Sequence, residues 1–102
     1  MVTARRGGAS FLTINFKMEK MEKQIIIAQR GWVFVGDVKK EGDEIIIENA
    51  SCVRKWGTPG KGLGFLADQG PQINTVLDAC GTVTIHHMAV VGRITCNADN
   101  WK

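Results

Sequence analysis

The chain has 102 residues, of which 44% are hydrophobic and 23% are charged, and its net charge is +3. This length fits one domain with one modest core, and the composition is typical of a globular protein. The longest apolar runs are far shorter than the roughly 18 residues of a membrane span, which excludes a transmembrane helix. Three cysteines, an odd number, do not suit a disulfide framework, so we expect a cytoplasmic protein.

The basic excess belongs to the start of the chain. Residues 1–23 carry five basic and two acidic side chains, whereas residues 24–102 carry eight of each. Residues 1–20 are small, basic and without a sustained period, so we expect an N-terminal extension, with the natural start at Met21. An ordered strand within residues 11–16 is the alternative. The remaining residues, 21–102, form the predicted domain.

The first half of this domain predicts strands. Residues 24–29 are rich in isoleucine, and residues 31–38 alternate, which would place Trp32 and Phe34 on one face as core residues. A turn is expected at residues 39–44, with its tip at 41–42. The next strand begins near residue 44 and extends toward Trp56.

The second half predicts one short helix and further strands. Residues 63–70 allow about two helical turns before Gly70 and Pro71 end them. Asp78 is expected in a turn. Strands follow at 82–87 and 88–96, with Gly92 marking a bulge or a close approach. The predicted fold is mainly β: a small barrel or rolled antiparallel sheet of five or six strands, OB-like or SH3-like, with one short helix. A β-sandwich is the alternative.

The stretch WGTPGKGLG, residues 56–64, raises the question of a phosphate loop. A Walker motif anchored on Gly60 and Lys61 would need glycine at residue 55 and a hydroxyl at residue 62, and neither is present. A weaker possibility is that backbone N–H groups of this glycine-rich loop form an anion-binding nest. The candidate ligand-binding residues are Arg54, Lys55, Trp56, Gly57, Thr58, Lys61, Gly62 and Gly64. The alternative is that the glycines only satisfy turns.

No catalytic residue, metal site or cofactor is predicted. His86 and His87 are neighbours on a strand and would point to opposite faces, so we expect one surface and one half-buried histidine. A nucleophilic set of Cys80, a histidine and Asp78 has no supporting motif. The cysteines are expected to be small buried residues. We therefore predict a binding protein and not an enzyme.

Three kinds of partner follow from these residues. An anionic ligand, such as a nucleotide, would use Arg54 and Lys61 for phosphate and Trp56 for stacking. Single-stranded nucleic acid has weaker support, because Trp56 is the one aromatic residue expected beside a basic cluster. A homo-oligomer joined through the edge strands of an unclosed sheet is the structural alternative.

The chain resembles a family of short uncharacterised proteins of tailed bacteriophages and prophages. The resemblance covers residues 21–102. Its pattern of Arg-x-Trp-Gly-Thr, Gly-Leu-Gly, Gly-Pro, Leu-Asp and Gly-Thr-Val falls on Arg54, Trp56, Gly57, Thr58, Gly62, Leu63, Gly64, Gly70, Pro71, Leu77, Asp78, Gly81, Thr82 and Val83. The basic pair His86-His87 departs from it.

The resemblance implies a phage origin and the host bacterial cytoplasm, with a place in the virion as the alternative. It implies no established activity. Three roles fit a small phage protein of this kind: binding a host nucleotide signal or a host defence protein, binding nucleic acid, or serving as a minor virion or assembly component. Because the pattern is concentrated in a loop, it favours binding.

Overall fold

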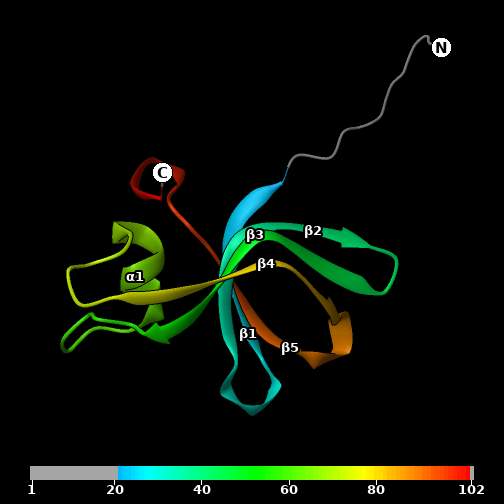
Figure 1. Cartoon of the computed structure of the whole chain (residues 1–102), viewed down its shortest axis with the longest axis horizontal. Coiled ribbons are helices and arrows are strands. Elements are labelled where there is room, and N and C mark those ends of the chain that lie inside the picture. Colours follow the sequence, from blue (N-terminus) through cyan, green and yellow to red (C-terminus); the bar gives the residue numbers. More distant parts are fainter. Residues whose placement is uncertain (1–20, 102) are drawn as a thin grey trace, which may run out of the picture.

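The computed structural model describes residues 21–101 and shows one curled sheet with a helix packed at one end (Figure 1). The predicted extension, residues 1–20, and its alternative strand lie outside the described residues. The elements in chain order are β1 (Glu22–Ala28), η1 (Gln29–Gly31), β2 (Val33–Glu41), β3 (Glu44–Lys55), α1 (Leu63–Gln69), β4 (Val76–His86), η2 (His87–Ala89), β5 (Val90–Thr95) and η3 (Ala98–Asn100).

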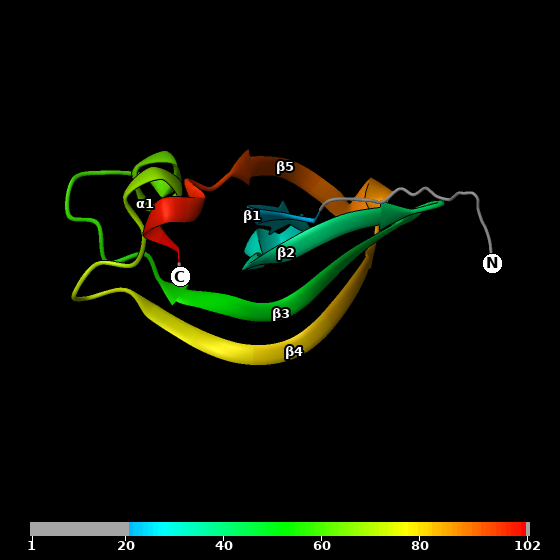
Figure 2. The same ribbon diagram turned by 90° about the horizontal axis from the view of Figure 1, so that it is seen from above.

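The five strands form an antiparallel sheet in the order β4-β3-β2-β1-β5. Figure 2 shows how strongly this sheet curls. A mainly β fold with a rolled antiparallel sheet and one short helix is thus confirmed. The closed barrel is wrong, because among the described residues β4 and β5 form no ladder and remain the two edges. The sandwich alternative is also absent from residues 21–101, where all five strands belong to one sheet.

Strand β1 explains the isoleucine run near the start of the domain. Ile25 and Ile26 are adjacent in sequence and therefore point to opposite faces, yet both are 0% exposed. A strand buried on both faces needs a continuous apolar run and not an alternating one. The two faces lead to two separate clusters of buried residues.

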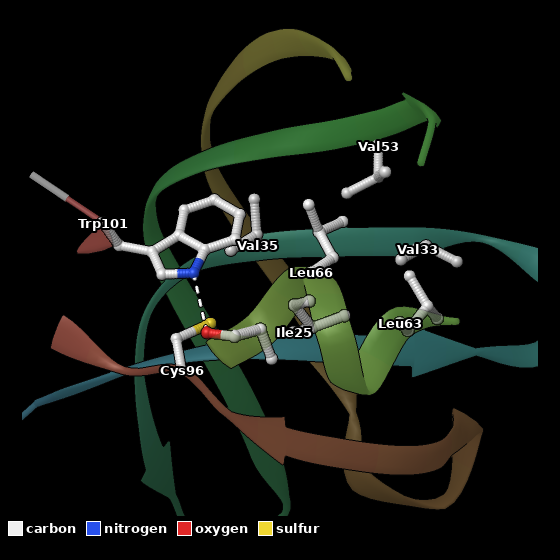
Figure 3. Packing of buried hydrophobic residues seen from close by; sticks show 9 residues of the cluster. Ile25, Val33, Val35, Val53, Leu63, Leu66, Cys96 and Trp101 are labelled. Carbon is white, nitrogen blue, oxygen red and sulfur yellow. Dashed lines mark hydrogen bonds between the residues drawn. The ribbon is translucent and has the colours of Figure 1, made fainter. Parts of the chain in front are cut away.

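The first cluster lies between the sheet and α1 (Figure 3). Its buried members are Ile25, Val33, Val35, Val53, Leu63, Leu66, Ala67, Cys96 and Trp101. The second cluster lies on the opposite face, and its buried members are Ile26, Val38, Ile45, Ile47 and Ala50. The sheet therefore has two small cores in place of one barrel interior.

Helix α1 confirms the helix predicted over 63–70. Leu63, Leu66 and Ala67, at helical spacing, are its buried residues. The Gly70 N–H donates to the Leu66 carbonyl oxygen at 2.8 Å and ends the helix. The Trp101 indole N–H donates to the Ala67 carbonyl oxygen at 2.9 Å (Figure 3), so the C-terminal segment is fastened to the helix.

The predicted core position of Trp32 is wrong. Its side chain is 54% exposed, although it stacks on the half-buried Phe34 with 5.9 Å between ring centroids. The turn before it has positive φ at Arg30 and at Gly31. Trp32 therefore lies in the turn, because the strand begins only at Val33.

The turn predicted at Asp78 is also wrong, because Asp78 lies inside β4. On β4, Gly81 pairs with Ala50 and Ala79 pairs with Ser51, which leaves Cys80 as an extra residue in a bulge. Gly81 has a φ of 80°. The glycine that suggested a turn thus serves a bulge in a continuous strand. A register shift beside Gly92 confirms the irregularity predicted there.

Both histidines are exposed, so the predicted half-buried histidine is wrong. The strand ends at His86 and the chain turns at His87, which lets the two rings stack at 4.9 Å. Of the cysteines, Cys96 is buried as predicted, whereas Cys52 is half-buried and Cys80 is exposed. In residues 21–101, the structure contains no helix long and apolar enough to cross a membrane.

Candidate anion-binding site

The structure brings two predicted site residues to a surface hollow at the end of the β3–β4 ladder. Arg54 and Lys55 line it, together with Val76, Leu77 and Asp78. We call it the β3–β4 hollow. Its volume is about 470 Å³, which is in the usual range for small-molecule pockets. It offers two cations, one carboxylate and two apolar side chains.

A β-bulge explains how two consecutive cations reach one hollow. In a regular strand, Arg54 and Lys55 would point to opposite faces. Val53 pairs with Leu77 and Lys55 pairs with Val76, so Arg54 is an extra residue on β3. A bulge of this kind bends the strand and redirects a side chain. The hollow therefore depends on a local irregularity of the ladder.

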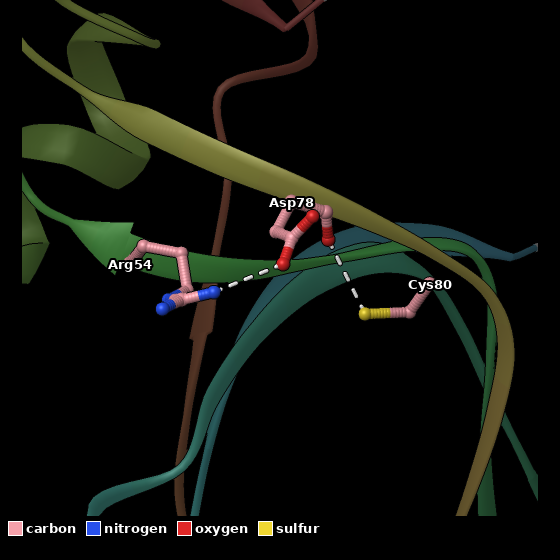
Figure 4. Close-up of polar contacts among 3 residues, drawn as sticks. All are labelled: Arg54, Asp78 and Cys80. Atoms are coloured by element: carbon pink, nitrogen blue, oxygen red, sulfur yellow. Dashed lines mark hydrogen bonds and ion pairs between the residues drawn. The ribbon is translucent and has the colours of Figure 1, made fainter.

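Arg54 forms an ion pair with Asp78 across the two strands (Figure 4). The Arg54 Nη1 atom donates to the Asp78 Oδ2 atom at 3.1 Å. Both side chains are about 60% exposed, at 62% and 60%. A pair so open to water contributes only about 0–1 kcal/mol to stability. An incoming anion can therefore compete with Asp78 for the guanidinium at little cost.

Trp56 follows directly after β3 and is 43% exposed. Its backbone carbonyl accepts a hydrogen bond from the Thr75 hydroxyl at 2.6 Å. This bond ties the residue after β3 to the residue before β4, so the strand ends stay together. The indole lies next in sequence to the cations of the hollow, but Trp56 is not among the residues that line it.

The loop between β3 and α1 is a self-contained turn. The Thr58 hydroxyl donates to the Lys61 carbonyl at 2.9 Å, and the Lys61 N–H donates to the Thr58 carbonyl at 2.8 Å. The buried Thr58 closes this turn from inside. One backbone donor that an anion nest would need is therefore already used within the loop.

The glycines of the loop serve backbone geometry. Gly57 has a φ of 69°, and a Cβ atom there would overlap the backbone at Asn74 and Thr75. Gly60 also has positive φ, at 71°. Gly62 precedes the first helical residue, and Gly64 lies within α1 facing open space. Turn geometry thus accounts for Gly57 and Gly60.

Lys61 contacts a residue of the helix and is not among the residues that line the hollow. Its Nζ atom lies 5.8 Å from the centroid of the Phe65 ring, in the range of a cation–π contact. The predicted site residues therefore separate into two groups. Arg54 and Lys55 lie at the hollow, with Trp56 beside them, whereas Gly57, Thr58, Lys61, Gly62 and Gly64 build the loop and the helix start.

Sequence reasoning missed three lining residues, Val76, Leu77 and Asp78, because they come from another strand. The antiparallel register pairs Val76 with Lys55, Leu77 with Val53 and Asp78 with Cys52, which brings this part of β4 beside the end of β3. The opposite charges of Arg54 and Asp78 were the one available signal. Only the strand pairing shows that these two charges lie together.

Residues 21–101 contain no group of three or more histidine, cysteine or acidic residues placed to hold a metal ion. Comparison with known protein families and with curated proteins finds no match for this chain. The resemblance to phage proteins therefore stays a prediction from the quoted motifs.

Proposed function

We propose that this protein is a small non-catalytic binding module for a phosphate-bearing ligand, built on a rolled antiparallel sheet. The ligand would be a nucleotide or a phosphorylated partner. The observation that carries the proposal is the bulge at Arg54, because it directs Arg54 and Lys55 to one hollow with an apolar side. The proposed site thus consists of the strand end and not of the glycine loop.

The proposed roles follow from the chemistry of the lining residues. Arg54 has a planar guanidinium that binds two phosphate oxygens at once, and Lys55 supplies a second positive charge. Val76 and Leu77 offer apolar contact to a sugar or a base. Trp56, which is 43% exposed and next in sequence to the cations, would stack on a base after a side-chain rotation.

Asp78 gives the site a preference among anions. It occupies Arg54 at 3.1 Å with a single negative charge. A phosphate monoester carries about −1.5 to −2 charges at neutral pH and three acceptor oxygens, so it competes better than a carboxylate ligand would. Combined with the phage-like motifs, this chemistry suggests capture of a host nucleotide signal in the bacterial cytoplasm.

The test is a titration of the full chain with mono-, di- and cyclic nucleotides. Binding is monitored by the backbone amide chemical shifts in NMR spectra and by the midpoint of thermal unfolding. We expect amide shifts that centre on residues 54–56 and 76–78. Arg54→Ala should weaken binding by roughly 1.5–3 kcal/mol, about tenfold or more, through loss of a charged hydrogen bond.

Two further variants locate the site. Arg93→Ala removes an exposed arginine on β5 that lines a different hollow, with Ile45 near the other end of β3, and should leave the affinity unchanged. Lys61→Ala should also have little effect, because Lys61 contacts Phe65. Equal losses in Arg54→Ala and Arg93→Ala would mean diffuse charge attraction, and a loss confined to Lys61→Ala would move the site to the glycine loop.

A second candidate function is assembly with further copies of the chain, favoured by the character of the β4 edge. This strand has 11 residues, and Asp78 is its only acidic, lysine or arginine side chain. A long edge strand with so little charge is open to pairing with another strand. Light scattering after size exclusion tests it: a stable symmetric oligomer supports assembly, and a monomer at high concentration removes this candidate.

A further inference from the structure

Cys52 and Cys80 are neighbours across the β3–β4 ladder, next to the Arg54–Asp78 pair. Cys52 pairs with Asp78, and Cys80 is the bulged residue two positions further along β4. Residues two apart on a strand point to the same face, so Cys80 lies diagonally across from Cys52.

The Cys80 thiol is folded back along its own strand toward Asp78, the residue that pairs with Cys52. Its Sγ atom donates to the Asp78 carbonyl oxygen at 3.2 Å (Figure 4). The thiol is also exposed, whereas that of Cys52 is half-buried. Of the two thiols, that of Cys80 is therefore the more accessible from solvent.

The electrostatics of Cys52 agree with this arrangement. Burial raises the pKa of the Cys52 thiol, and the nearby Cys80 raises it further, while Arg54 acts in the opposite direction. The two thiols are thus close enough to influence each other. Because Cys52 keeps its proton more firmly than an open thiol, it is the poorer first nucleophile.

We propose that Cys52 and Cys80 form a peroxide-reactive dithiol site. The Cys80 thiolate attacks one oxygen of hydrogen peroxide, the O–O bond breaks, and hydroxide leaves, which gives a sulfenic acid at Cys80. The Cys52 sulfur then attacks the Cys80 sulfur, the S–O bond breaks, and water leaves. Two thiols are oxidised to one disulfide while one peroxide is reduced to two waters.

Closing this bond requires a small movement of β4. Diagonal neighbours on adjacent strands are typically about 7–8 Å apart between Cα atoms, and a disulfide spans at most about 7 Å. β4 is the edge of the sheet, so it can shift toward β3 without displacing a further strand. The bulge at Cys80 supplies the local freedom.

Cys96 provides an internal control. It is 7% exposed, and burial raises its pKa to about 11, so it should resist both oxidation and alkylation in the folded protein. It comes from the end of β5 and belongs to the cluster beneath α1, away from the β4 edge.

The experiment treats the reduced full chain with hydrogen peroxide, alkylates free thiols after unfolding, and maps the products by peptide mass spectrometry. We expect a disulfide between Cys52 and Cys80, with Cys96 recovered as the alkylated thiol. Cys80→Ser should abolish the oxidation. Cys52→Ser should trap the sulfenic acid, so that dimedone labels Cys80 about tenfold more than in the unchanged protein.

Cys96→Ser should leave the reaction unchanged, and circular dichroism of each variant confirms that it is folded. Equal dimedone labelling of Cys80 with and without Cys52 would overturn the proposal, because Cys52 would then resolve nothing. A disulfide between Cys80 residues of two chains would also overturn it, and would favour assembly through the β4 edge. Neither result depends on whether the β3–β4 hollow binds a nucleotide.

Discussion

Two neighbouring regions at the C-terminal end of β3, the cluster beneath α1 and the β3–β4 hollow, differ in how tightly they are packed. Beneath α1, Leu66 is 0% and Trp101 8% exposed, and the chain closes around them. At the β3–β4 hollow, Arg54 and Asp78 are each about 60% exposed, at 62% and 60%, and the ladder is interrupted by bulges. The first region therefore contributes most to stability, and the second offers charged side chains that a ligand can reach.

Two glycines are required by close packing, whereas Gly60, Gly62 and Gly64 face open space. At Gly57 a Cβ atom would meet the neighbouring backbone, and at Gly70 it would overlap the Asn100 carbonyl oxygen. The cations that suit a ligand stand just outside the glycine-rich stretch, at the end of β3. The glycine-rich stretch thus reflects turn geometry and one close backbone approach, while the cationic side chains lie beside it.

The largest effect should come from Trp101→Ala. It removes a buried ring from the cluster beneath α1 and one hydrogen bond to Ala67, so we expect the free energy of unfolding to fall by about 3–5 kcal/mol. Urea denaturation measures it. The control, Trp101→Phe, keeps most of the apolar area and should lower the free energy of unfolding by about half as much. If Trp101→Ala lowers it by less than about 1 kcal/mol, the C-terminal segment does not stabilise the fold.

A smaller loss is expected for Gly70→Ala. Gly70 has a φ of 84°, and its added methyl would push Asn100 away from the helix end. Backbone strain of this kind costs about 1–3 kcal/mol. Gly64→Ala is the matched control within the same helix, because a Cβ atom there meets open space. It should raise stability by about 0.5–1 kcal/mol through helix propensity, and a loss at both positions would contradict the packing difference.

The smallest effect on stability should come from Arg54→Met. The exposed ion pair with Asp78 contributes little, so the free energy of unfolding should change by less than about 0.5 kcal/mol. The same urea series, repeated at high salt, checks this value. A loss above about 2 kcal/mol would instead make the pair a structural clamp and remove the contrast between the two regions.

Local signals in the sequence predicted much of the fold. The apolar spacing of 63–67 with glycine at residue 70 gave the helix, and the polar residues around Gly42 gave the turn between β2 and β3. The burial of Trp101 and the exposure of Trp32 could not be predicted, because they depend on which segments pack together. The pairing of Arg54 with Asp78 across β3 and β4 was out of reach for the same reason.

We expect the pairing of β5 with β1 to limit the folding rate of this chain. The hairpin of β2 and β3 closes over a short turn, and β1 precedes β2 by only a few residues, so these three strands can pair early. Gln24, in contrast, meets Thr95 across about 70 intervening residues, and such distant pairings form slowly because loop closure costs entropy first. Until β5 pairs with β1, β1 is an unpaired edge strand. Partly folded chains can then aggregate through such exposed edges.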